Sequence, residues 1–298
     1  MLRFKAEHKT LQIGSIKVGG KPGLAPTVLV GSIFYNKHYV LKDELKGEFD
    51  REEAERLIKL QEEFSDRTGN PHMVDVVGST AEALNRFVDF VSSVTEAPIL
   101  LDGTTAAVRI RGLDHIEDCG LEDRVVYNSI SPDFKREEIE RIRDVGIKNA
   151  ILLAFTAEFT SQAKIRGIRE LLPVANDAGI ENPLIDAAVV DIPSLGLACR
   201  VIYELTAELG LPVGAGVHNA IATWRGLKTK MGSQAKDSSM AAASAIAVAS
   251  GASFVLYGPI ESADSMFPAI AMVDAAFAQV AIEEGAMPDP KHPIFRIA

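Results

Sequence analysis

The chain has 298 residues, with 31 lysines and arginines against 41 aspartates and glutamates, which gives a formal net charge of −10. This length is enough to bury the core of one large domain or of two ordinary ones. The basic residues are scattered along the chain, and binding to nucleic acid requires clustered cations opposite the phosphates. Nucleic acid is therefore not expected as a partner.

The two cysteines, Cys119 and Cys199, stand alone in the sequence, without CxxC spacing. This makes a disulfide framework and a cysteine zinc site improbable and fits a reducing cytoplasm. Residues 1–10 carry charges where a signal peptide has its apolar core. The uncharged stretch 238–260 is rich in alanine and serine and is interrupted by glycine and proline, which predicts a closely packed helix and a buried strand. We expect a soluble, cytoplasmic protein that does not insert into a membrane.

Eight short apolar runs alternate with longer amphipathic segments. Near-continuous apolar runs are typical of parallel strands covered on both faces. The runs occupy residues 27–34, 72–78, 98–102, 124–130, 149–156, 182–190, 211–217 and 252–260.

The segments between these runs carry helix start and stop signals. Asp50 and Ser79 each stand before an amphipathic stretch and are expected to be N-caps. Gly146 follows a third such stretch and is expected to be its C-cap.

Eight strand–helix repeats predict an α/β fold of the (β/α)₈ TIM-barrel type. A doubly wound sheet is the alternative, but no GxGxxG motif follows the first run. Residues 11–20 alternate with period two around Gly14-Ser15, which predicts an N-terminal hairpin that closes the bottom of the barrel. No linker divides the chain, so we predict a single domain over residues 1–298.

Polar residues stand in or just after the apolar runs, where the active sites of such barrels lie. Burying one of them without partners costs about 1–3 kcal/mol, so their presence needs an explanation. These residues are Asp75, Asp102, Asn128, Asp186, His218 and Asn219.

Taken singly, three of these residues have structural explanations. Asp102 precedes Gly-Thr-Thr and fits the N-cap of the next helix as well as it fits a ligand. Asn128 would also satisfy a turn, and His218 would also be a packed, hydrogen-bonded core residue. Six polar residues that converge on one rim are harder to explain structurally.

The residue types at the strand ends disfavour several kinds of catalytic mechanism. No strand end carries a lysine for a Schiff base, and no GxSxG elbow is present for a serine nucleophile. Three carboxylates and an imidazole are legitimate metal ligands, but short ligand spacing is missing. The remaining candidate is a flat heterocycle rich in N–H donors, such as a pterin, which carboxylates and amides can hold by charge-assisted hydrogen bonds worth about 1.5–3 kcal/mol each.

Four motifs resemble successive motifs of the pterin-binding methyltransferase barrels. From about residue 10 to about residue 262, the order and spacing of motifs are similar to those of the family formed by the H subunit of tetrahydromethanopterin S-methyltransferase and its soluble bacterial relatives. The four motifs are ILLDGTT (99–105), VVYNSI (125–130), PLIDAAV (183–189) and VGAGVHN (213–219).

The resemblance implies roles for individual residues. Asn219 matches the asparagine that approaches N5 of the pterin, the atom that carries the methyl group. The glycines of the seventh run would let the backbone approach the flat ring, and two further residues are weaker matches. The implied ring ligands are Asp102, Asn128 and Asp186; the glycines are Gly214 and Gly216; the weaker matches are Asp75 and His218.

The implied reaction is methyl transfer between a methylcorrinoid protein and N5 of tetrahydrofolate, giving methyltetrahydrofolate, with the corrinoid on a partner protein and no metal ion on this chain. One alternative is a tetrahydromethanopterin-specific subunit of a larger complex, and another is a metal-dependent barrel hydrolase. A dihydropteroate synthase is disfavoured, because the last run lacks its arginine and no lysine follows the seventh run before Lys228. We also expect a homodimer. Residues 35–50 form a lid, a docking surface for the partner or an inert loop.

Overall fold

The computed structural model describes residues 6–298; the first five residues of the charged segment 1–10 lie outside the described part. Eight parallel strands close into a barrel in chain order, which confirms the predicted (β/α)₈ fold. The barrel strands are β3 (Val28–Ile33), β6 (His72–Gly78), β7 (Ile99–Gly103), β8 (Val125–Ile130), β9 (Asn149–Leu153), β10 (Asn182–Asp186), β11 (Val213–Ala215) and β12 (Phe254–Pro259).

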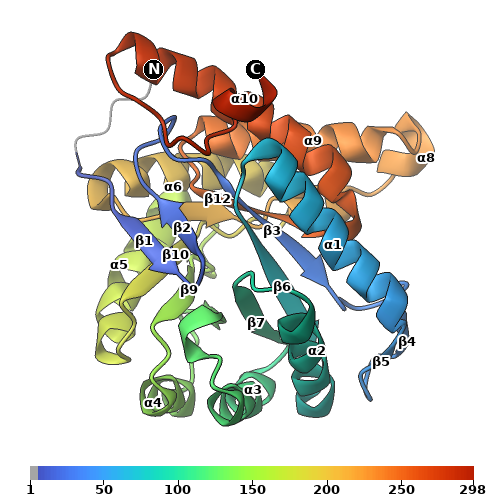
Figure 1. Cartoon of the computed structure of the whole chain (residues 1–298). Helices are drawn as coiled ribbons and strands as arrows, with labels where there is room; N and C mark the ends of the chain where they lie inside the picture. Colours follow the sequence, from blue (N-terminus) through green and yellow to red (C-terminus); the bar gives the residue numbers. More distant parts are fainter. Residues whose placement is uncertain (1–5) are drawn as a thin grey trace.

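The outer layer consists of one long helix after each barrel strand, and these helices surround the strands in Figure 1. They are α1 (Arg51–Thr68), α2 (Ala81–Val94), α3 (Ala106–Cys119), α4 (Arg136–Val145), α5 (Ser161–Asp177), α6 (Ile192–Leu209), α9 (Ala235–Ala249) and α10 (Ala263–Glu283). Two short helices, α7 (His218–Ala222) and α8 (Leu227–Met231), stand between β11 and α9, and α11 (Ile294–Ile297) follows α10.

Two of the three predicted helix caps are confirmed. The Asp50 carboxylate accepts a backbone N–H of the first turn of α1 at 3.2 Å, and Gly146 ends α4 with φ 79°. The N-cap of α2 is Thr80, so the prediction of Ser79 is wrong. The Ser79 hydroxyl donates instead to the carboxylate of Glu44, a contact that lies far away in sequence.

The predicted hairpin consists of β1 (Thr10–Ile13) and β2 (Ile16–Gly19), joined by the turn at Gly14-Ser15. Its apolar face packs against the side chains that fill the barrel interior, and so the hairpin closes the N-terminal end of the barrel. The hairpin contributes Leu11, Ile13 and Val18, and the strands contribute Val28, Val30, Met73, Leu100, Val126, Ile151, Leu184, Phe254 and Leu256.

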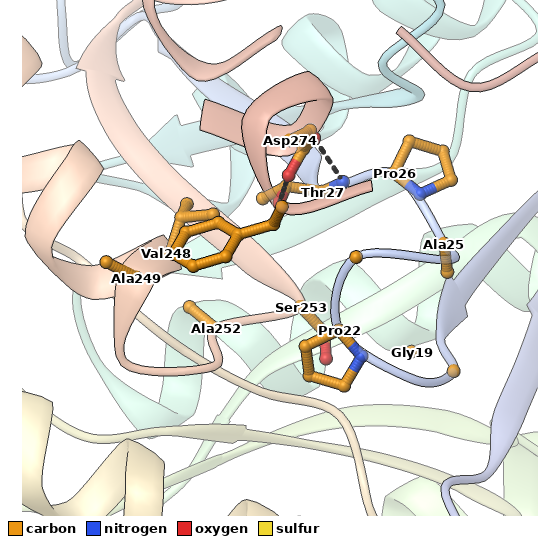
Figure 2. A pocket seen from close by; sticks show the side chains of 13 residues that line it. Gly19, Pro22, Ala25, Pro26, Thr27, Val248, Ala249, Ala252, Ser253 and Asp274 are labelled. Atoms are coloured by element: carbon orange, nitrogen blue, oxygen red, sulfur yellow. Dashed lines mark hydrogen bonds between the residues drawn. The ribbon is translucent and has the colours of Figure 1, made fainter. Parts of the chain in front are cut away.

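A buried carboxylate ties the last helix to this closed end. Asp274 of α10 accepts hydrogen bonds from the backbone N–H of Thr27, from its hydroxyl, and from the amide of Asn70, at 2.7–2.8 Å. Burial raises the pKa of Asp274 to about 6. Figure 2 shows the Asp274–Thr27 bonds beside a cavity of about 40 Å³, between the loop after the hairpin and the turn between α9 and β12.

The uncharged stretch 238–260 divides between α9 and β12, as the sequence predicts. Among residues 6–298, one helix, Ile260–Glu283, is long and apolar enough to cross a membrane by length and composition alone, and 44% of its apolar window is buried. It packs against α1 and α9 as the last helix of the barrel.

Candidate functional site

The strand period places the predicted polar residues in the barrel mouth. Side chains two residues apart point to the same face of a strand, so a polar residue two positions after an interior core residue also faces inward. In each strand the polar residue therefore lies closer to the C-terminal end of the strand than the core residue does. The pairs are Met73 and Asp75, Leu100 and Asp102, Val126 and Asn128, and Leu184 and Asp186.

One cavity of about 790 Å³ occupies this mouth and brings together all the predicted site residues except Gly214. The predicted residues in its wall are Asp75, Asp102, Asn128, Asp186, Gly216, His218 and Asn219.

The structure gives Gly214 a different role from the one predicted. A Cβ at this position would lie 2.2 Å from the carbonyl oxygen of Phe254 on the neighbouring strand. The glycine is therefore required by strand packing, and the expectation that it lets a ligand approach the backbone is wrong. Gly216 does line the cavity, and a Cβ there would lie 3.4 Å from the Asn219 amide nitrogen.

Asp75 is the hydrogen-bonded centre of the mouth. Its carboxylate accepts from the Ser32 hydroxyl at 2.7 Å and from the Asn128 amide at 3.2 Å, and the side chain is almost fully buried. Burial, with a smaller effect of the charge of Asp186, raises its pKa to about 6, although the two hydrogen bonds oppose the shift. Asn128 of β8 thus bonds a carboxylate on β6, two strands away, instead of satisfying a turn. Ser32 was missed, although it is a polar residue inside the first apolar run.

Asp102 keeps its carboxylate available for a ligand. The N-cap of α3 is Thr105, whose hydroxyl accepts the Val108 N–H at 3.3 Å, so the capping explanation for Asp102 is wrong. Within residues 6–298, no hydrogen bond to the Asp102 carboxylate is recorded. Burial, and then the charge of Asp75, raise its pKa well above the ordinary value, while Arg109 opposes the shift.

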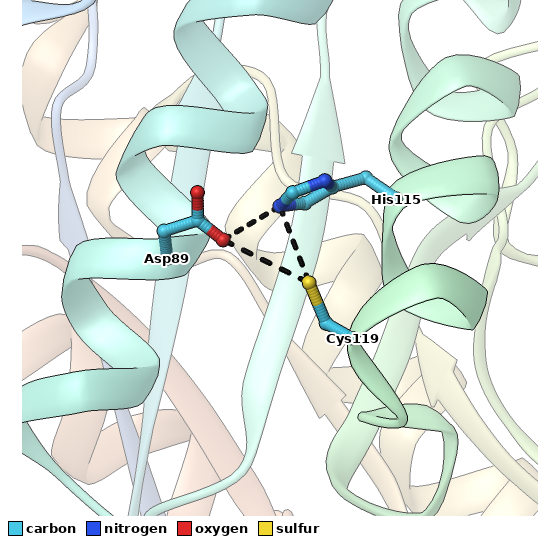
Figure 3. Close-up of side chains that lie close together, drawn as sticks. All are labelled: Asp89, His115 and Cys119. Atoms are coloured by element: carbon cyan, nitrogen blue, oxygen red, sulfur yellow. Dashed lines mark hydrogen bonds and ion pairs between the residues drawn. The ribbon is translucent and has the colours of Figure 1, made fainter.

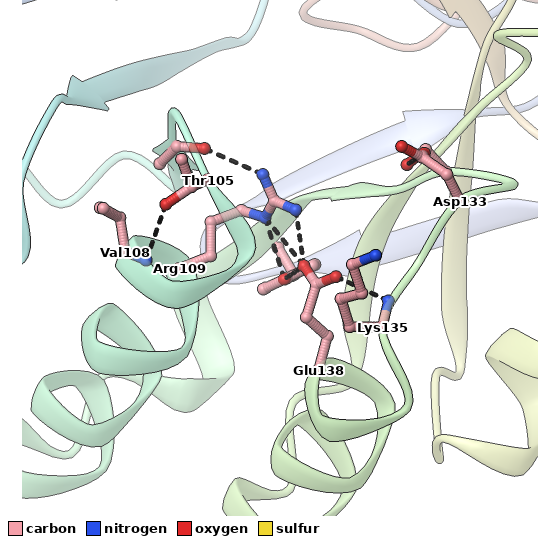
Figure 4. Close-up of polar contacts among 9 residues, drawn as sticks. Thr105, Val108, Arg109, Asp133, Lys135 and Glu138 are labelled. Atoms are coloured by element: carbon pink, nitrogen blue, oxygen red, sulfur yellow. Dashed lines mark hydrogen bonds and ion pairs between the residues drawn. The ribbon is translucent and has the colours of Figure 1, made fainter.

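An ion-pair network behind β7 supports this position. Arg109 donates to the carbonyl oxygen of Gly103 at 2.9 Å, to the Tyr127 hydroxyl at 2.9 Å and to Glu138 at 2.5 Å. The Tyr127 hydroxyl also donates to Glu138. Figure 4 shows Arg109 of α3 reaching across to Glu138 of α4. The network fixes the residue that follows Asp102.

Asp186 is held by the backbone that follows β10. Its Oδ1 accepts the N–H of Ala188 at 2.7 Å, and burial raises its pKa. Ala188 has φ 53°, a conformation that L-residues other than Asn and Asp seldom adopt. The buried ammonium group of Lys164 donates to the carbonyl oxygens of Ala187 and Ala188 at 3.0 and 2.6 Å. Sequence reasoning searched for lysines at strand ends and so missed this one, which comes from α5.

His218 and Asn219 begin α7 and face the same cavity. Nδ1 of His218 lies 3.1 Å from the carbonyl oxygen of Leu256, and burial lowers the pKa of the imidazole. A neutral ring therefore donates through Nδ1 and keeps an acceptor at Nε2. Among the described residues, the Asn219 amide has no recorded hydrogen-bond partner, so its donor and acceptor are both available to a ligand.

Residues 35–50 form an ordered hairpin with strands β4 (Leu41–Asp43) and β5 (Glu48–Phe49). The aromatic rings of Phe34 and Phe87 stack beneath it with centroids 4.1 Å apart. Tyr35 is the residue of this segment that lines the cavity, and its hydroxyl donates to Glu261 at 2.8 Å. Whether the hairpin docks a partner stays a prediction.

Within residues 6–298, one group of three side chains could hold a metal ion, and it lies on the outer helices away from the mouth. Figure 3 shows Asp89 of α2 with His115 and Cys119 of α3. Nε2 of His115 lies 2.6 Å from Asp89 Oδ1 and 3.6 Å from the Cys119 sulfur. The hydrogen bond between Asp89 and His115 accounts for this contact. The His-x₃-Cys spacing was missed because Cys119 was treated as isolated.

The comparisons with known proteins show the family of the chain. The family model described as "Tetrahydromethanopterin S-methyltransferase MtrH subunit" matches residues 6–288. The H subunit of tetrahydromethanopterin S-methyltransferase from Methanopyrus kandleri is 40% identical and that from Methanothermobacter thermautotrophicus 39%, over 96% and 100% of both chains. The H subunit of a putative methyltransferase mtx from Methanosarcina mazei is 38% identical over 99% of both chains.

Solved structures of dihydropteroate synthases share the fold. The synthase of Yersinia pestis, in complex with a pterine-sulfa conjugate, superposes with a TM-score of 0.63 at 15% identity, over 90% of this chain and 99% of that one. The synthase of Coxiella burnetii, in complex with pteroic acid, gives 0.63 at 14% identity, over 91% and 100%. At this level of identity, the likeness shows the fold alone.

The relatives correct one expectation and confirm another. The prediction of tetrahydrofolate as the methyl acceptor is wrong, because the family model and the relatives from Methanopyrus kandleri and Methanothermobacter thermautotrophicus are named for tetrahydromethanopterin. The methyltransferase class and the family resemblance are confirmed. The chain belongs to the family of the tetrahydromethanopterin S-methyltransferase MtrH subunit.

Proposed function

We propose that the barrel mouth binds a reduced pterin of the tetrahydromethanopterin type and that the chain catalyses methyl transfer between its N5 and a corrinoid carried by a partner protein. The observation that carries the proposal is the convergence of Asp75, Asp102 and Asp186 in one cavity, with the amides of Asn128 and Asn219 beside them. The names of the relatives support the substrate, and because those names describe subunits, they also support action within a complex.

The site suits a heterocycle with donors along its edges. The 2-amino group and N3–H of a pterin can donate side by side to one carboxylate, and Asp102 has its carboxylate free for such a pair. The Asn219 amide, also free, can donate or accept, so it can serve N5 with or without a proton. Neither residue needs to move away from another partner in order to bind.

In the proposed reaction, no residue of this chain forms a covalent bond to the methyl group. The corrinoid of the partner supplies the cobalt that exchanges the methyl group. When the pterin is demethylated, the N5–CH₃ bond breaks, its electron pair stays on N5, the methyl group passes to cobalt and N5 takes up a proton. In the reverse direction N5 loses that proton, its lone pair bonds the methyl carbon, and the bond between the methyl group and the partner's cobalt breaks with its electron pair left on cobalt. The protein holds N5 at attack distance, with Asn219 hydrogen-bonded to it.

Calorimetric titration with methyl-tetrahydromethanopterin tests the binding proposal. We expect saturable binding by the wild type and about 10–100-fold weaker binding by Asp102→Asn, because a charge-assisted hydrogen-bond pair is lost. Asp144→Asn, an exposed change on α4, is the matched control and should bind as the wild type does. A wild-type protein that binds no tetrahydromethanopterin would overturn the proposal.

The methyl-transfer rate tests the role of Asn219. With cob(I)alamin as acceptor, Asn219→Ala should transfer the methyl group about 10–100-fold more slowly, while its affinity for the pterin changes little. An unchanged rate of methyl transfer in Asn219→Ala would show that Asn219 has no role in the reaction.

A further inference from the structure

The segment 224–236, called here the basic segment, differs in charge from the rest of this acidic chain. It carries Arg225, Lys228, Lys230 and Lys236, and no aspartate or glutamate stands between Glu208 and Asp237. Within residues 6–298, none of these four cations belongs to a recorded ion pair, whereas many other lysines and arginines do. The positive charge of the basic segment is therefore uncompensated.

The basic segment forms part of the wall of the same cavity that holds the predicted pterin ligands. Lys228 of α8 and Lys236 of α9 both line it, and the Lys236 residue is half-buried. Figure 1 shows α8 at the outer end of α9, on the rim of the molecule. Lys228 is exposed and Lys236 half-buried, whereas Asp75 and Asp186 at the strand ends are buried.

The same cavity also has an apolar part. Ile221, Trp224, Leu227 and Met240 line it together with the strand-end carboxylates and the two lysines. A ligand that fits the whole cavity therefore has a donor-rich head, an apolar part and an anionic end. The volume of about 790 Å³ lies within the range of pockets that enclose whole drug-sized ligands, so the cavity has room for more than a bicyclic ring.

We infer that Lys228 and Lys236 bind the anionic side chain of the reduced pterin and so select a substituted pterin over its bare ring system. The inference rests on the proposed function, because it concerns the far end of the same ligand. The lysines attract the tail as point charges close to solvent, and such contacts weaken as salt rises.

The test compares two probes and two double variants. The probes are methyl-tetrahydromethanopterin, with its acidic side chain, and 6-methyltetrahydropterin, which has the ring and no charged tail. The variants are Lys228→Gln with Lys236→Gln, and a control, Lys17→Gln with Lys148→Gln, which changes exposed lysines of the hairpin and of the segment before β9 at the closed end of the barrel. Affinity is measured by calorimetry at about 20 mM and about 300 mM salt.

We expect the mouth variant to bind the intact pterin about 5–20-fold more weakly at low salt and to bind 6-methyltetrahydropterin as the wild type does. It should also lose most of the salt dependence shown by the wild type. The control variant should behave as the wild type with both probes.

Four outcomes overturn the inference. Equal loss of affinity for both probes would show that the lysines act on the shape of the mouth. If the double variant binds the intact pterin as tightly as the wild type, the two lysines do not bind the tail. If that variant also transfers the methyl group to the corrinoid partner more slowly, the lysines contribute to docking of the partner. Wild-type protein that binds both probes equally would show that no tail site exists, while pterin binding itself stands. Binding of neither probe would overturn the proposed function as well.

Discussion

The ammonium group of Lys164 lies 2.6 Å from the carbonyl oxygen of Ala188, whose own N–H bonds the carboxylate of Asp186. A residue of the outer helix α5 thereby positions Asp186, a proposed pterin ligand of the mouth, without lining the cavity itself. The positive φ of Ala188 persists because both its carbonyl oxygen and its N–H are bonded in this way.

Replacing Lys164 should therefore affect pterin binding from outside the cavity. We expect Lys164→Met to lower the free energy of unfolding by about 1–3 kcal/mol, because buried carbonyl oxygens lose their donor, and to weaken pterin binding about tenfold. Urea unfolding and calorimetric titration measure the two effects. Lys148→Met, at an exposed position, should leave both unchanged. Full affinity in a folded Lys164→Met protein would refute the positioning role.

The raised pKa of Asp75 predicts how pterin binding depends on pH. Because burial raises this pKa to about 6, the carboxyl group takes up a proton as the pH falls through about 6, and a protonated carboxyl accepts ligand donors poorly. Affinity for the pterin should therefore be constant above about pH 7 and fall below about pH 6. Asp75→Asn should bind more weakly at pH 7 with a flatter profile, whereas a profile like that of the wild type would assign the dependence to Asp102 or Asp186.

Gly258 fixes the place of His218. It has φ 88°, and a Cβ there would lie 2.7 Å from Cβ of His218. Gly258→Ala should lower the free energy of unfolding by about 2–4 kcal/mol and displace His218, with weaker pterin binding. Gly285→Ala is the matched control, because it has φ 85° and no atom within 4 Å of its Cβ position. It should lose about 1 kcal/mol and keep its affinity. Equal effects of the two changes would mean that only the backbone strain matters.

The Arg109–Glu138 pair should be a strong determinant of stability. The side chain of Glu138 is 4% exposed and that of Arg109 16%, so removing the cation leaves a buried carboxylate unpaired. We expect Arg109→Met to lower the free energy of unfolding by about 3–5 kcal/mol. Arg111→Met, on the same helix with a 73% exposed side chain, should change it by less than about 1 kcal/mol. Urea unfolding of the two variants measures both changes. Similar decreases in the free energy of unfolding would contradict a special role of the Arg109–Glu138 pair.

The residues of the barrel mouth could be predicted from the sequence because their placement depends on patterns within single strands. A strand buried on both faces must be apolar along its length, so an aspartate within such a run is conspicuous. The strand period then places Asp75, Asp102 and Asp186 inside the barrel at the same end as their strands' carboxyl termini. The inward direction and the shared rim follow from the repeat of strand and helix alone.

Other features depend on which distant segments meet, and only the tertiary structure decided them. Thr80 caps α2 because Glu44 engages Ser79, and Gly214 is a glycine because Phe254 lies against it. Lys164 reaches the mouth from a helix, and Lys228 and Lys236 of residues 224–236 line the cavity that holds the acidic strand ends. The sequence by itself determined the barrel, its closed end and the acidic mouth, because burial and strand period act along the chain. The cap of α2, the supporting lysine and the charge of the rim were decided by contacts across the fold, because a side chain's partner is set by packing and not by sequence spacing.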